Sequence, residues 1–273
     1  TDRLLVSRAA LHFWEEPCIS GIGENAPGSG TVFFSGCSLG CCFCQNYQIS
    51  RGAVGKEISV ARLCEIFLEL QQQGAANINL VTPDHFAPAI LAALSAAKPA
   101  LTLPIACNCS GYETLKTVRA LAEQVDIFMP DLKFFDPDLS GRLAAAPDYF
   151  AFALPAICEM VRLCGAPVFD AAGLLRRGVI VRHLVLPGHR EDSLHLLDAL
   201  AAALPTDSFI LSLMSQYTPY HTGAYPELNR RLSTFEYKTV TRRAEELGFD
   251  YLYTQQRSAA KEEYTPPFDF EGV

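Results

Sequence analysis

The sequence lacks the features that mark several classes of protein. It has no apolar run near the roughly 18 residues of a membrane-spanning helix, and no basic segment followed by an apolar stretch that would indicate a signal peptide. It also lacks an excess of positive charge, because 22 basic residues stand against 30 acidic ones and leave a net charge of −8. A general nucleic-acid binder needs basic surface to neutralise phosphates. We therefore expect a cytoplasmic chain that has neither nucleic acid nor a membrane as its partner.

Length and composition are those of a folded chain with a large core. Of the 273 residues, 49% are hydrophobic and 19% are charged, which excludes a disordered protein. A chain this long and apolar does not need disulfide staples, and clustered cysteines in a cytosolic protein indicate metal binding or catalysis. The ten cysteines are Cys18, Cys37, Cys41, Cys42, Cys44, Cys64, Cys107, Cys109, Cys158 and Cys164.

Apolar segments typical of buried strands alternate with helical patterns from residue 31 onward. The expected strands are 31–35, 77–81, 104–109, 125–129, 179–186 and 209–214, with a possible last strand at 250–254. The expected helices are 59–73, 87–97, 113–123, 150–164, 194–203 and 233–247. A hairpin is expected to start at 168–169, and residues 1–30 are expected to be irregular.

This alternation predicts an α/β fold with a parallel sheet covered on both faces. Six strand–helix units make a partial (βα)6 barrel of the TIM type, since a closed barrel of eight units needs about 250 residues for the units alone. We assign the barrel to residues 31–258, with an N-terminal extension over 1–30 and a C-terminal tail over 259–273. Within the tail, we expect 261–263 to be solvated and 266–270 to dock on the rest of the protein.

Polar and sulfur-containing residues follow the expected strands. In such folds the functional residues lie at the carboxyl ends of the strands. The segments at these ends are 36–37, 82–84, 108–110, 131–133, 187–189 and 216–217. Their polar character supports the strand assignment independently of the apolar pattern.

The strongest signal is a cysteine motif directly after the first expected strand. Cys37, Cys41 and Cys44 have the spacing C-x3-C-x2-C. Thiolates normally hold a cubane iron–sulfur cluster in fours, so a tight loop with three leaves one iron open for another ligand. Zinc is the alternative, but a structural zinc site needs a fourth ligand and usually paired spacings, and disulfides between such close cysteines have poor geometry. Cys42 lies between ligands that must converge, so we do not expect it to bind a metal.

This motif, with Phe43 before its last cysteine, resembles the radical S-adenosylmethionine (SAM) superfamily. The segments that resemble its PflX-like branch, which is related to pyruvate formate-lyase activating enzymes, are 15–18, 35–37, 44–50, 131–133, 182–188 and 216–219. The resemblance covers nearly the whole chain. It implies one [4Fe-4S] cluster whose open iron is chelated by the amino and carboxylate groups of SAM, and reductive cleavage of SAM to a 5′-deoxyadenosyl radical that abstracts hydrogen. The protein itself binds and orients the reactants, and it excludes water and oxygen from them.

The resemblance also implies roles for residues at the strand ends. Phe43 either lies near the adenine of SAM or only packs under the loop. Asn108 and Ser110 match a turn that contacts the cofactor, although relatives have an acidic residue where this chain has Asn108. Lys133 would neutralise the SAM carboxylate, and Asp131 would hold Lys133 or a ribose hydroxyl. The alternative is a plain ion pair between these two, since residues two apart on a strand point the same way.

Three further residues carry possible roles. Arg182 lies in a barrel strand and needs a partner if it is buried, so an anionic or carbonyl ligand is expected there. Tyr217 either contacts the adenosine or packs at the rim of the barrel. Cys18 is a redox-active thiol, a hydrogen donor or a buried cysteine without a role.

Thr82 and Asp84, on either side of Pro83, have two interpretations. As helix signals, they are an N-cap, a proline at the first helical position and an acid at the positive end of the helix. As binding residues, they follow the second strand, where relatives bind the SAM amino group through backbone carbonyls and a carboxylate. Asp84 would then replace a glutamate of the relatives.

The resemblance favours an activating enzyme that installs a glycyl radical in a partner protein and receives electrons from a reductant such as flavodoxin or ferredoxin. Segment 82–84 departs from the Gly-Gly-Glu-Pro stretch of activating enzymes, so a radical SAM enzyme that acts on a small molecule or another peptide is the first alternative. A non-enzymatic iron–sulfur electron carrier or sensor is the second. The remaining cysteines form no second ferredoxin-type run, so we expect a single cluster.

Overall fold

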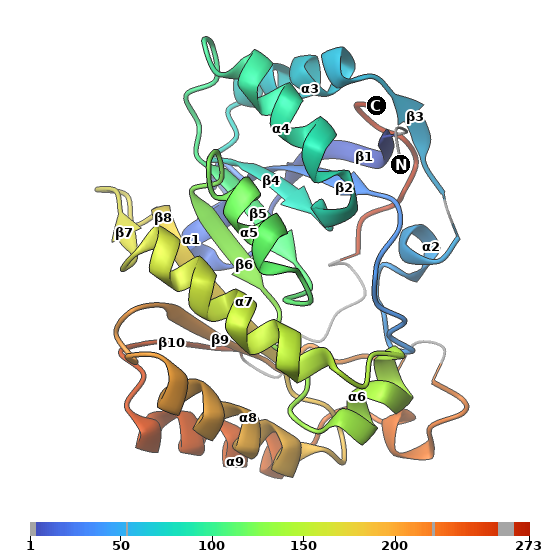
Figure 1. Cartoon of the computed structure of the whole chain (residues 1–273), viewed down its shortest axis with the longest axis vertical. Helices are drawn as coiled ribbons and strands as arrows, with labels where there is room; N and C mark the ends of the chain where they lie inside the picture. The colour runs from blue at the N-terminus through green and yellow to red at the C-terminus, as the bar shows by residue number, and fades with distance from the viewer. Residues whose placement is uncertain (1–3, 53, 220–221, 256–264) are drawn as a thin grey trace.

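The central element is an open sheet of mostly parallel strands. The computed structural model describes residues 4–52, 54–219, 222–255 and 265–273. The strands follow the order β10-β9-β8-β6-β5-β4-β2-β1-β3, and their path can be followed in Figure 1. The parallel strands are β2 (Ser29–Phe34), β4 (Ile78–Val81), β5 (Ile105–Cys109), β6 (Ile127–Pro130), β8 (Leu175–Leu184), β9 (Ile210–Met214) and β10 (Tyr251–Thr254). Among the described strands, β10 and β3 are the edges and do not pair, so the barrel is partial, as predicted.

Helices cover the outer face of this sheet (Figure 1). They are α3 (Val60–Gln72), α4 (Ala87–Ala97), α5 (Leu115–Leu121), α7 (Tyr149–Cys164), α8 (Arg190–Ala203) and α9 (Thr234–Leu247). Local chemistry sets their boundaries. The Ser59 hydroxyl accepts a hydrogen bond from the backbone N of Arg62 at 3.1 Å where α3 begins, and Ser233 and Glu236 form a capping box where α9 begins. Every expected strand and helix from residue 31 onward is present, which confirms the α/β prediction.

The N-terminal segment contains a strand, so the expectation of an irregular segment is wrong. β1 (Leu4–His12) pairs antiparallel with β2 on one side and with β3 (Lys56–Ile58) on the other. Ser7 and Arg8 interrupt its apolar pattern, and the polar groups of both find partners in residues far away in the sequence. The Ser7 hydroxyl hydrogen-bonds that of Ser35 at 2.6 Å. Arg8 pairs with Asp269 of the tail, also at 2.6 Å.

The short helix α1 (Pro17–Ser20) closes the amino end of the barrel. Cys18 and Ile19 are buried there and share an apolar cluster with Ile127 at the start of β6. The side-chain amide of Asn77 donates to the backbone O of Ile19 at 2.7 Å and fixes the helix to the sheet. The N-terminal segment thus contributes to the core of the barrel, whereas the division into extension, barrel and tail stays a prediction.

The C-terminal tail docks on the first strands, as expected for residues 266–270. The ring of Phe268 packs edge to face on Phe33 of β2, with 5.6 Å between the ring centroids. The expectation for 261–263 falls outside the described residues. The remaining short elements are α2 (Tyr47–Ser50), η1 (Asp84–Phe86), α6 (Pro137–Ala144), β7 (Val168–Phe169) and η2 (Pro226–Leu228). β7 pairs antiparallel with β8 and forms the predicted hairpin.

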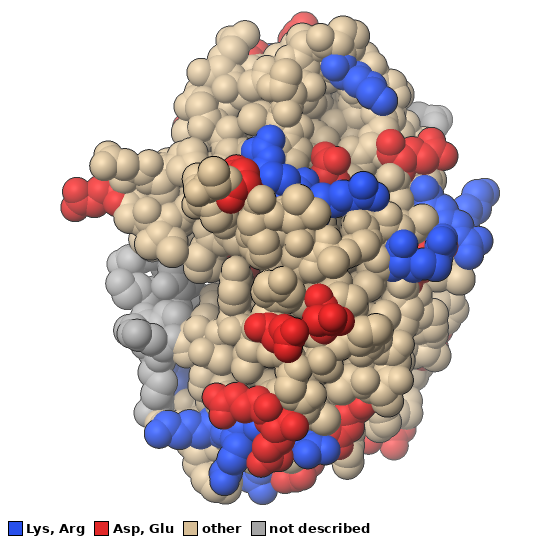
Figure 2. Space-filling model, turned by 90° about the vertical axis from the view of Figure 1, so that its left-hand side faces the viewer, with Lys and Arg blue, Asp and Glu red and all other residues tan. Residues whose placement is uncertain are grey.

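The helical surface carries charges of both signs. Figure 2 shows acidic and basic side chains interspersed at the lower end of the molecule, where α8 and α9 lie. Arg243 of α9 pairs there with Asp198 of α8 at 2.7 Å. Among the described residues, no single helix is long and apolar enough to cross a membrane. Only α6 and α7 together reach that length and composition, and they are bent by 97° against each other.

Candidate active site

A cavity of about 240 Å³ lies at the carboxyl ends of the parallel strands. Most of the residues singled out in the sequence line it. These are Cys37, Cys41, Phe43, Cys44, Thr82, Asn108, Ser110, Asp131, Lys133 and Arg182. Cys18, Asp84 and Tyr217 do not line it. The fold therefore brings together residues that are up to 145 positions apart at the end of the barrel where function was expected.

The cysteine loop is fastened to the strands and helices around it. Gly36 follows β2 with φ +99°, and a Cβ there would lie 3.0 Å from the His85 ring, so the turn favours glycine. Further along, the backbone N of Gly40 donates to the O of Ala144 at 2.8 Å. The backbone N of Cys42 donates to the end of α6 in the same way, and its side chain does not line the cavity. The loop is held in one path with its three spaced cysteines at the cavity.

The donor set of the loop fits an iron–sulfur cluster. Burial raises the pKa of the Cys41 thiol to about 12, although Lys133 opposes this, and burial raises the pKa of Cys37 as well. Thiols in such surroundings lose their protons when metal ions take the protons' place. A fourth thiol, Cys109, also lines the cavity, but it interacts with Cys107 and Glu113. Three loop thiols fit a [4Fe-4S] cluster with one open iron.

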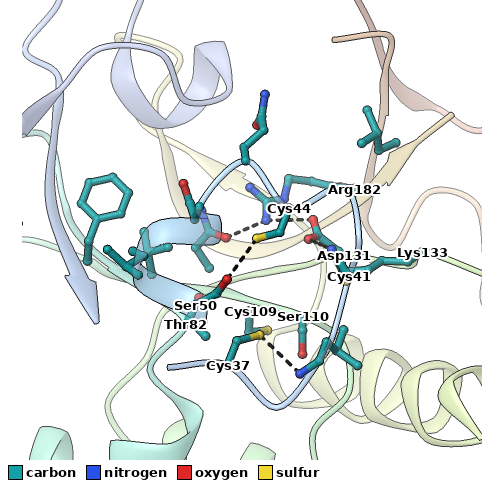
Figure 3. Close-up of a pocket in the computed structure, with 18 of the residues that line it drawn as sticks. Cys37, Cys41, Cys44, Ser50, Thr82, Cys109, Ser110, Asp131, Lys133 and Arg182 are labelled. Atoms are coloured by element: carbon teal, nitrogen blue, oxygen red, sulfur yellow. Dashed lines mark hydrogen bonds and ion pairs between the residues drawn. The ribbon is translucent and has the colours of Figure 1, made fainter. Parts of the chain in front are cut away.

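A charged network forms another wall of the cavity. The Asp131 carboxylate pairs with the Lys133 ammonium and, at 2.8 Å, with Arg182. Arg182 also donates to the Asn108 side chain at 2.6 Å. Figure 3 shows Arg182 and Asp131 turned toward each other beside the cysteine loop. Lys133 and Arg182 thus share Asp131 as an ion-pair partner. The buried Arg182 is therefore paired with a residue of the protein itself.

Electrostatics keeps this wall ionised. Burial alone would raise the pKa of Asp131, but Arg182 and Lys133 outweigh burial and hold it below its ordinary value. Burial alone would lower the pKa of Lys133, but Asp131 and Cys41 raise it overall. A fixed ammonium therefore faces the cavity at neutral pH, and such a group suits an anionic ligand group.

Tyr149 of α7 fixes the strand ends that carry these charges. Its hydroxyl lies 2.7 Å from the backbone O of Asp131 and 2.8 Å from that of Ser110, to which it can donate, and it accepts from the backbone N of Lys133 at 3.0 Å. Gly111 makes this close approach possible. It has φ +80°, and a Cβ would meet the O of Asp131 at 2.2 Å.

The turn after β4 has neither Thr82 as a helix cap nor Pro83 at the first helical position, so these two predictions are wrong, whereas Asp84 does lie in the first turn of η1. Thr82 has φ +56°, in the left-handed region that β-branched residues rarely adopt. Its backbone N donates to the O of Asn108 at 2.8 Å, so the turn follows the neighbouring strand. The 3₁₀ turn η1 begins at Asp84 without a side-chain cap, and α4 begins only at Ala87. Strained residues of this kind gather at binding sites.

The other singled-out residues take up packing positions. Phe43 packs on Tyr217 with 6.4 Å between the centroids and faces the cavity from a buried site. The Tyr217 hydroxyl donates to the backbone O of Leu228 at 2.8 Å. Cys18 lies at the opposite end of the barrel, and burial raises the pKa of its thiol to about 12. The structure brings neither Cys18 nor the Tyr217 hydroxyl to the cavity.

The N-terminal segment supplies cavity residues that the sequence did not single out. His12, Trp14 and Glu15 line the cavity. The Glu15 carboxylate accepts from the Asn79 side chain at 2.9 Å and lies 4.0 Å from Arg182. Glu15 belongs to segment 15–18, which resembles the PflX-like branch, and that signal could have placed it at the site.

The fold and the site define a class of protein, namely α/β partial barrels that carry an iron–sulfur cluster on a cysteine loop after the first parallel strand. The Radical SAM superfamily model matches residues 31–200. This is more than half of the chain, so the chain belongs to the radical SAM superfamily. Its cofactors are those of the family, a [4Fe-4S] cluster and SAM.

Several known proteins are similar to this chain. An uncharacterized protein of Methanocaldococcus jannaschii is 28% identical over 236 residues, which are 82% of this chain and 64% of that protein. Streptococcus suis SuiB bound to SAM has a TM-score of 0.52 and 11% identity over 81% of this chain and 48% of its own. A domain of the pyruvate formate-lyase activating enzyme from Bacteroides vulgatus has a TM-score of 0.50 and 13% identity over 67% of this chain and 100% of its own. At these identities the solved structures show a shared fold. The chain spans less than two thirds of the length of the first two.

Proposed function

We propose that this chain is a radical SAM enzyme that abstracts a hydrogen atom from a peptide-bound residue, with a glycyl residue of a partner protein as the leading candidate. The observation that carries the proposal is the position of a fixed ion pair, Lys133 with Asp131, in the same cavity as Cys37, Cys41 and Cys44. A cation next to an open cluster site suits the carboxylate of SAM. The PflX-like branch remains our assignment within the superfamily.

The side chains of the cavity divide the work of binding. Cys37, Cys41 and Cys44 would hold the cluster, which supplies the electron that cleaves SAM to the hydrogen-abstracting radical. Lys133 would donate a charge-assisted hydrogen bond to the SAM carboxylate. Asp131 keeps the Lys133 ammonium in place and is itself held by Arg182 from the barrel interior.

The strand-end turns and the apolar lining complete the site. Thr82, Asn108 and Ser110 face the cavity from β4 and β5 and would contact the rest of SAM. Phe43 lines the cavity and would pack on the adenine. Apolar side chains exclude water from the cavity; they are Phe33, Phe34, Val81, Leu184, Leu186 and Met214. Asp84 does not line the cavity, so its position does not support a role in binding the SAM amino group.

A peptide substrate is supported by the entrance of the cavity. Trp14 lines the cavity and is 56% exposed, and the neighbouring Phe13 is 47% exposed. Exposed aromatic residues are typical of sites that bind other proteins. The names of two proteins of the same fold also point to protein or peptide substrates. They are a pyruvate formate-lyase activating enzyme and SuiB bound to the precursor peptide SuiA. Flavodoxin or ferredoxin in the cytoplasm is the proposed reductant.

Isotope transfer tests the reaction and the substrate together. The cluster-replete protein is incubated without oxygen with SAM, dithionite and an extract of its own organism grown on glycine deuterated at the α carbon. We expect 5′-deoxyadenosine that carries deuterium, together with a doublet in the electron paramagnetic resonance (EPR) spectrum of a protein fraction. An extract labelled at alanine instead is the matched control and should yield unlabelled product.

The possible outcomes separate the alternatives. If the product carries no deuterium from glycine, the glycyl substrate is wrong. Deuterium from another labelled residue would indicate a different peptide substrate. If no 5′-deoxyadenosine forms at all, the chain does not act as a radical SAM enzyme and an electron carrier or sensor is the better assignment.

A further inference from the structure

Four ionisable side chains gather next to the cavity, and one of them, Cys109, also lines it. Cys107 and Cys109 alternate along β5 and so face the same side, opposite to Asn108, which joins Arg182 inside the barrel. Asp84 begins η1 after the neighbouring strand β4. One oxygen of Asp84 and the two sulfurs lie within 4.8 Å of one another.

Glu113 adds a second carboxyl group to this cluster. It is 5% exposed and interacts with the side chains of Asp84 and Cys109. One of its oxygens accepts a hydrogen bond from the Ser110 hydroxyl at 2.8 Å. Its other oxygen, and Oδ1 of Asp84, are buried without a hydrogen-bond partner among the described residues.

The cluster lacks a compensating positive charge. Burial raises the pKa of Asp84 to about 6. Burial and the Asp84 charge raise the pKa of Glu113 well above its ordinary value. No cationic side chain from the described part of the chain is among the groups that shift either pKa. Two buried carboxyl groups with free oxygens require either a shared proton or a bound cation, because an uncompensated buried charge is costly.

The two thiols decide which cation fits. Calcium and magnesium prefer oxygen ligands, whereas two sulfurs with carboxylate oxygens suit zinc. A tetrahedral zinc ion with Zn–S bonds of about 2.3 Å places its two sulfurs about 3.8 Å apart. The two sulfurs, which lie within 4.8 Å of each other, therefore need to approach by no more than about 1 Å.

We propose that Asp84, Cys107, Cys109 and Glu113 bind one zinc ion. The ion replaces the two thiol protons and offsets two of the four negative charges that the thiolates and carboxylates carry when they are all ionised, and the unpartnered oxygens become ligands. It ties η1 to β5 and thereby fixes the two turns that carry Thr82 and Ser110 into the cavity. All four ligands belong to the protein, so the site is closed and structural.

Metal analysis of the intact holoenzyme tests this proposal. The protein is purified without oxygen with its iron–sulfur cluster, incubated with one equivalent of zinc chloride and desalted. We expect one tightly bound zinc per chain in addition to the cluster iron. The X-ray absorption spectrum at the zinc edge should show two sulfur and two oxygen neighbours. No retained zinc would overturn the proposal. Zinc with three sulfur neighbours would also overturn it, because such zinc would occupy the cysteine loop.

A double variant, Cys107→Ser with Cys109→Ser, gives a second readout. It should lose the zinc and keep the cluster iron, while Cys158→Ser on α7 is the matched control and should keep both metals. Zinc retained by the folded double variant would contradict the assignment. Because the spectrum of the wild-type protein already decides the ligand set, the proposal remains testable if the double variant does not fold.

Discussion

Arg182 and His183 are neighbours on β8 that meet opposite surroundings on the two faces of the sheet. Arg182 faces the barrel interior and keeps its charge beside Asp131. His183 faces the helices and is 1% exposed. Its ring lies 2.7 Å from the backbone O of Leu132 and 2.8 Å from the Ser193 hydroxyl, and burial lowers its pKa to about 4. At this point of β8 the interior holds a charged side chain, whereas the outer face holds a neutral ring with a hydrogen-bond partner at each nitrogen.

β5 repeats this comparison with one exception. Asn108 lies on the inner face and accepts a hydrogen bond from Arg182. Cys107 and Cys109 lie on the other face of the strand beside Asp84 and Glu113, although Cys109 also reaches the cavity. These carboxyl groups have buried oxygens without a hydrogen-bond partner among the described residues, whereas both ring nitrogens of His183 have one. A metal ion would give these oxygens a partner, and this is the physical reason to look for one there.

The largest effect is expected in the cysteine loop. Cys41→Ala should abolish the cluster and all cleavage of SAM, because too few thiolates remain to hold the cubane. Cys42→Ala is the matched control one residue away and should keep iron near the wild-type amount. Iron content and 5′-deoxyadenosine yield measure both. If Cys42→Ala lost its iron while Cys41→Ala kept it, the ligand assignment would be wrong.

The interior charges are expected to couple strongly to stability. Arg182→Met should lower the free energy of unfolding by about 3–5 kcal/mol, because it leaves the buried Asp131 carboxylate without one of its two cations. Urea unfolding of the cluster-replete protein measures the change. Arg190→Met on the surface of α8 is the control, with an expected loss below about 0.5 kcal/mol. Equal losses in the two variants would show that the interior pair is no more important than a surface charge.

The pH dependence of stability tests whether His183 on the outer face is neutral. The folded-state pKa of His183 is about 4 and its ordinary value is 6.5, so the neutral ring stabilises the fold above about pH 6.5. This stability is lost as the pH falls through 6.5 toward 4. Relative to His183→Gln, the wild-type protein should lose about 3 kcal/mol of unfolding free energy between pH 7 and pH 4. A difference between the two proteins that does not change with pH would refute a neutral buried His183.

The smallest effect is expected for a variant that weakens SAM binding and leaves the fold intact. Lys133→Ala should weaken SAM binding by about 1.5–3 kcal/mol, the range for a charge-assisted hydrogen bond. The cluster should assemble normally. Equilibrium binding of SAM to the cluster-replete variant measures the loss, and unchanged affinity would remove Lys133 from this role.

The sequence predicts the parallel barrel because its signals are local. Each buried strand is an apolar run, and each helix has its own period and end signals, so both can be recognised without knowing their partners. β1 escapes this reasoning because Ser7 and Arg8 find their partners 28 and 261 residues away. The local sequence around Ser7 and Arg8 does not indicate which distant residues they contact.

The features of the site that could be predicted are likewise those that are local in the sequence. The cysteine motif is compact in sequence, and the Asp131–Lys133 pair follows from strand alternation, so both could be predicted. The approach of Glu15 to Arg182 and the contact between Asp84 and Glu113 depend on how distant segments cross. The left-handed turn at Thr82 depends on the neighbouring strand, and its sequence looks like an ordinary helix start.

The response of the reduced cluster to SAM tests the central claim most directly. If the cavity places SAM on the open iron beside Lys133, adding SAM to the dithionite-reduced protein should change the EPR spectrum of the cluster. Lys133→Ala should need a higher SAM concentration for the same change. A spectrum that stays the same at saturating SAM, in a protein with a full complement of iron, would contradict the account.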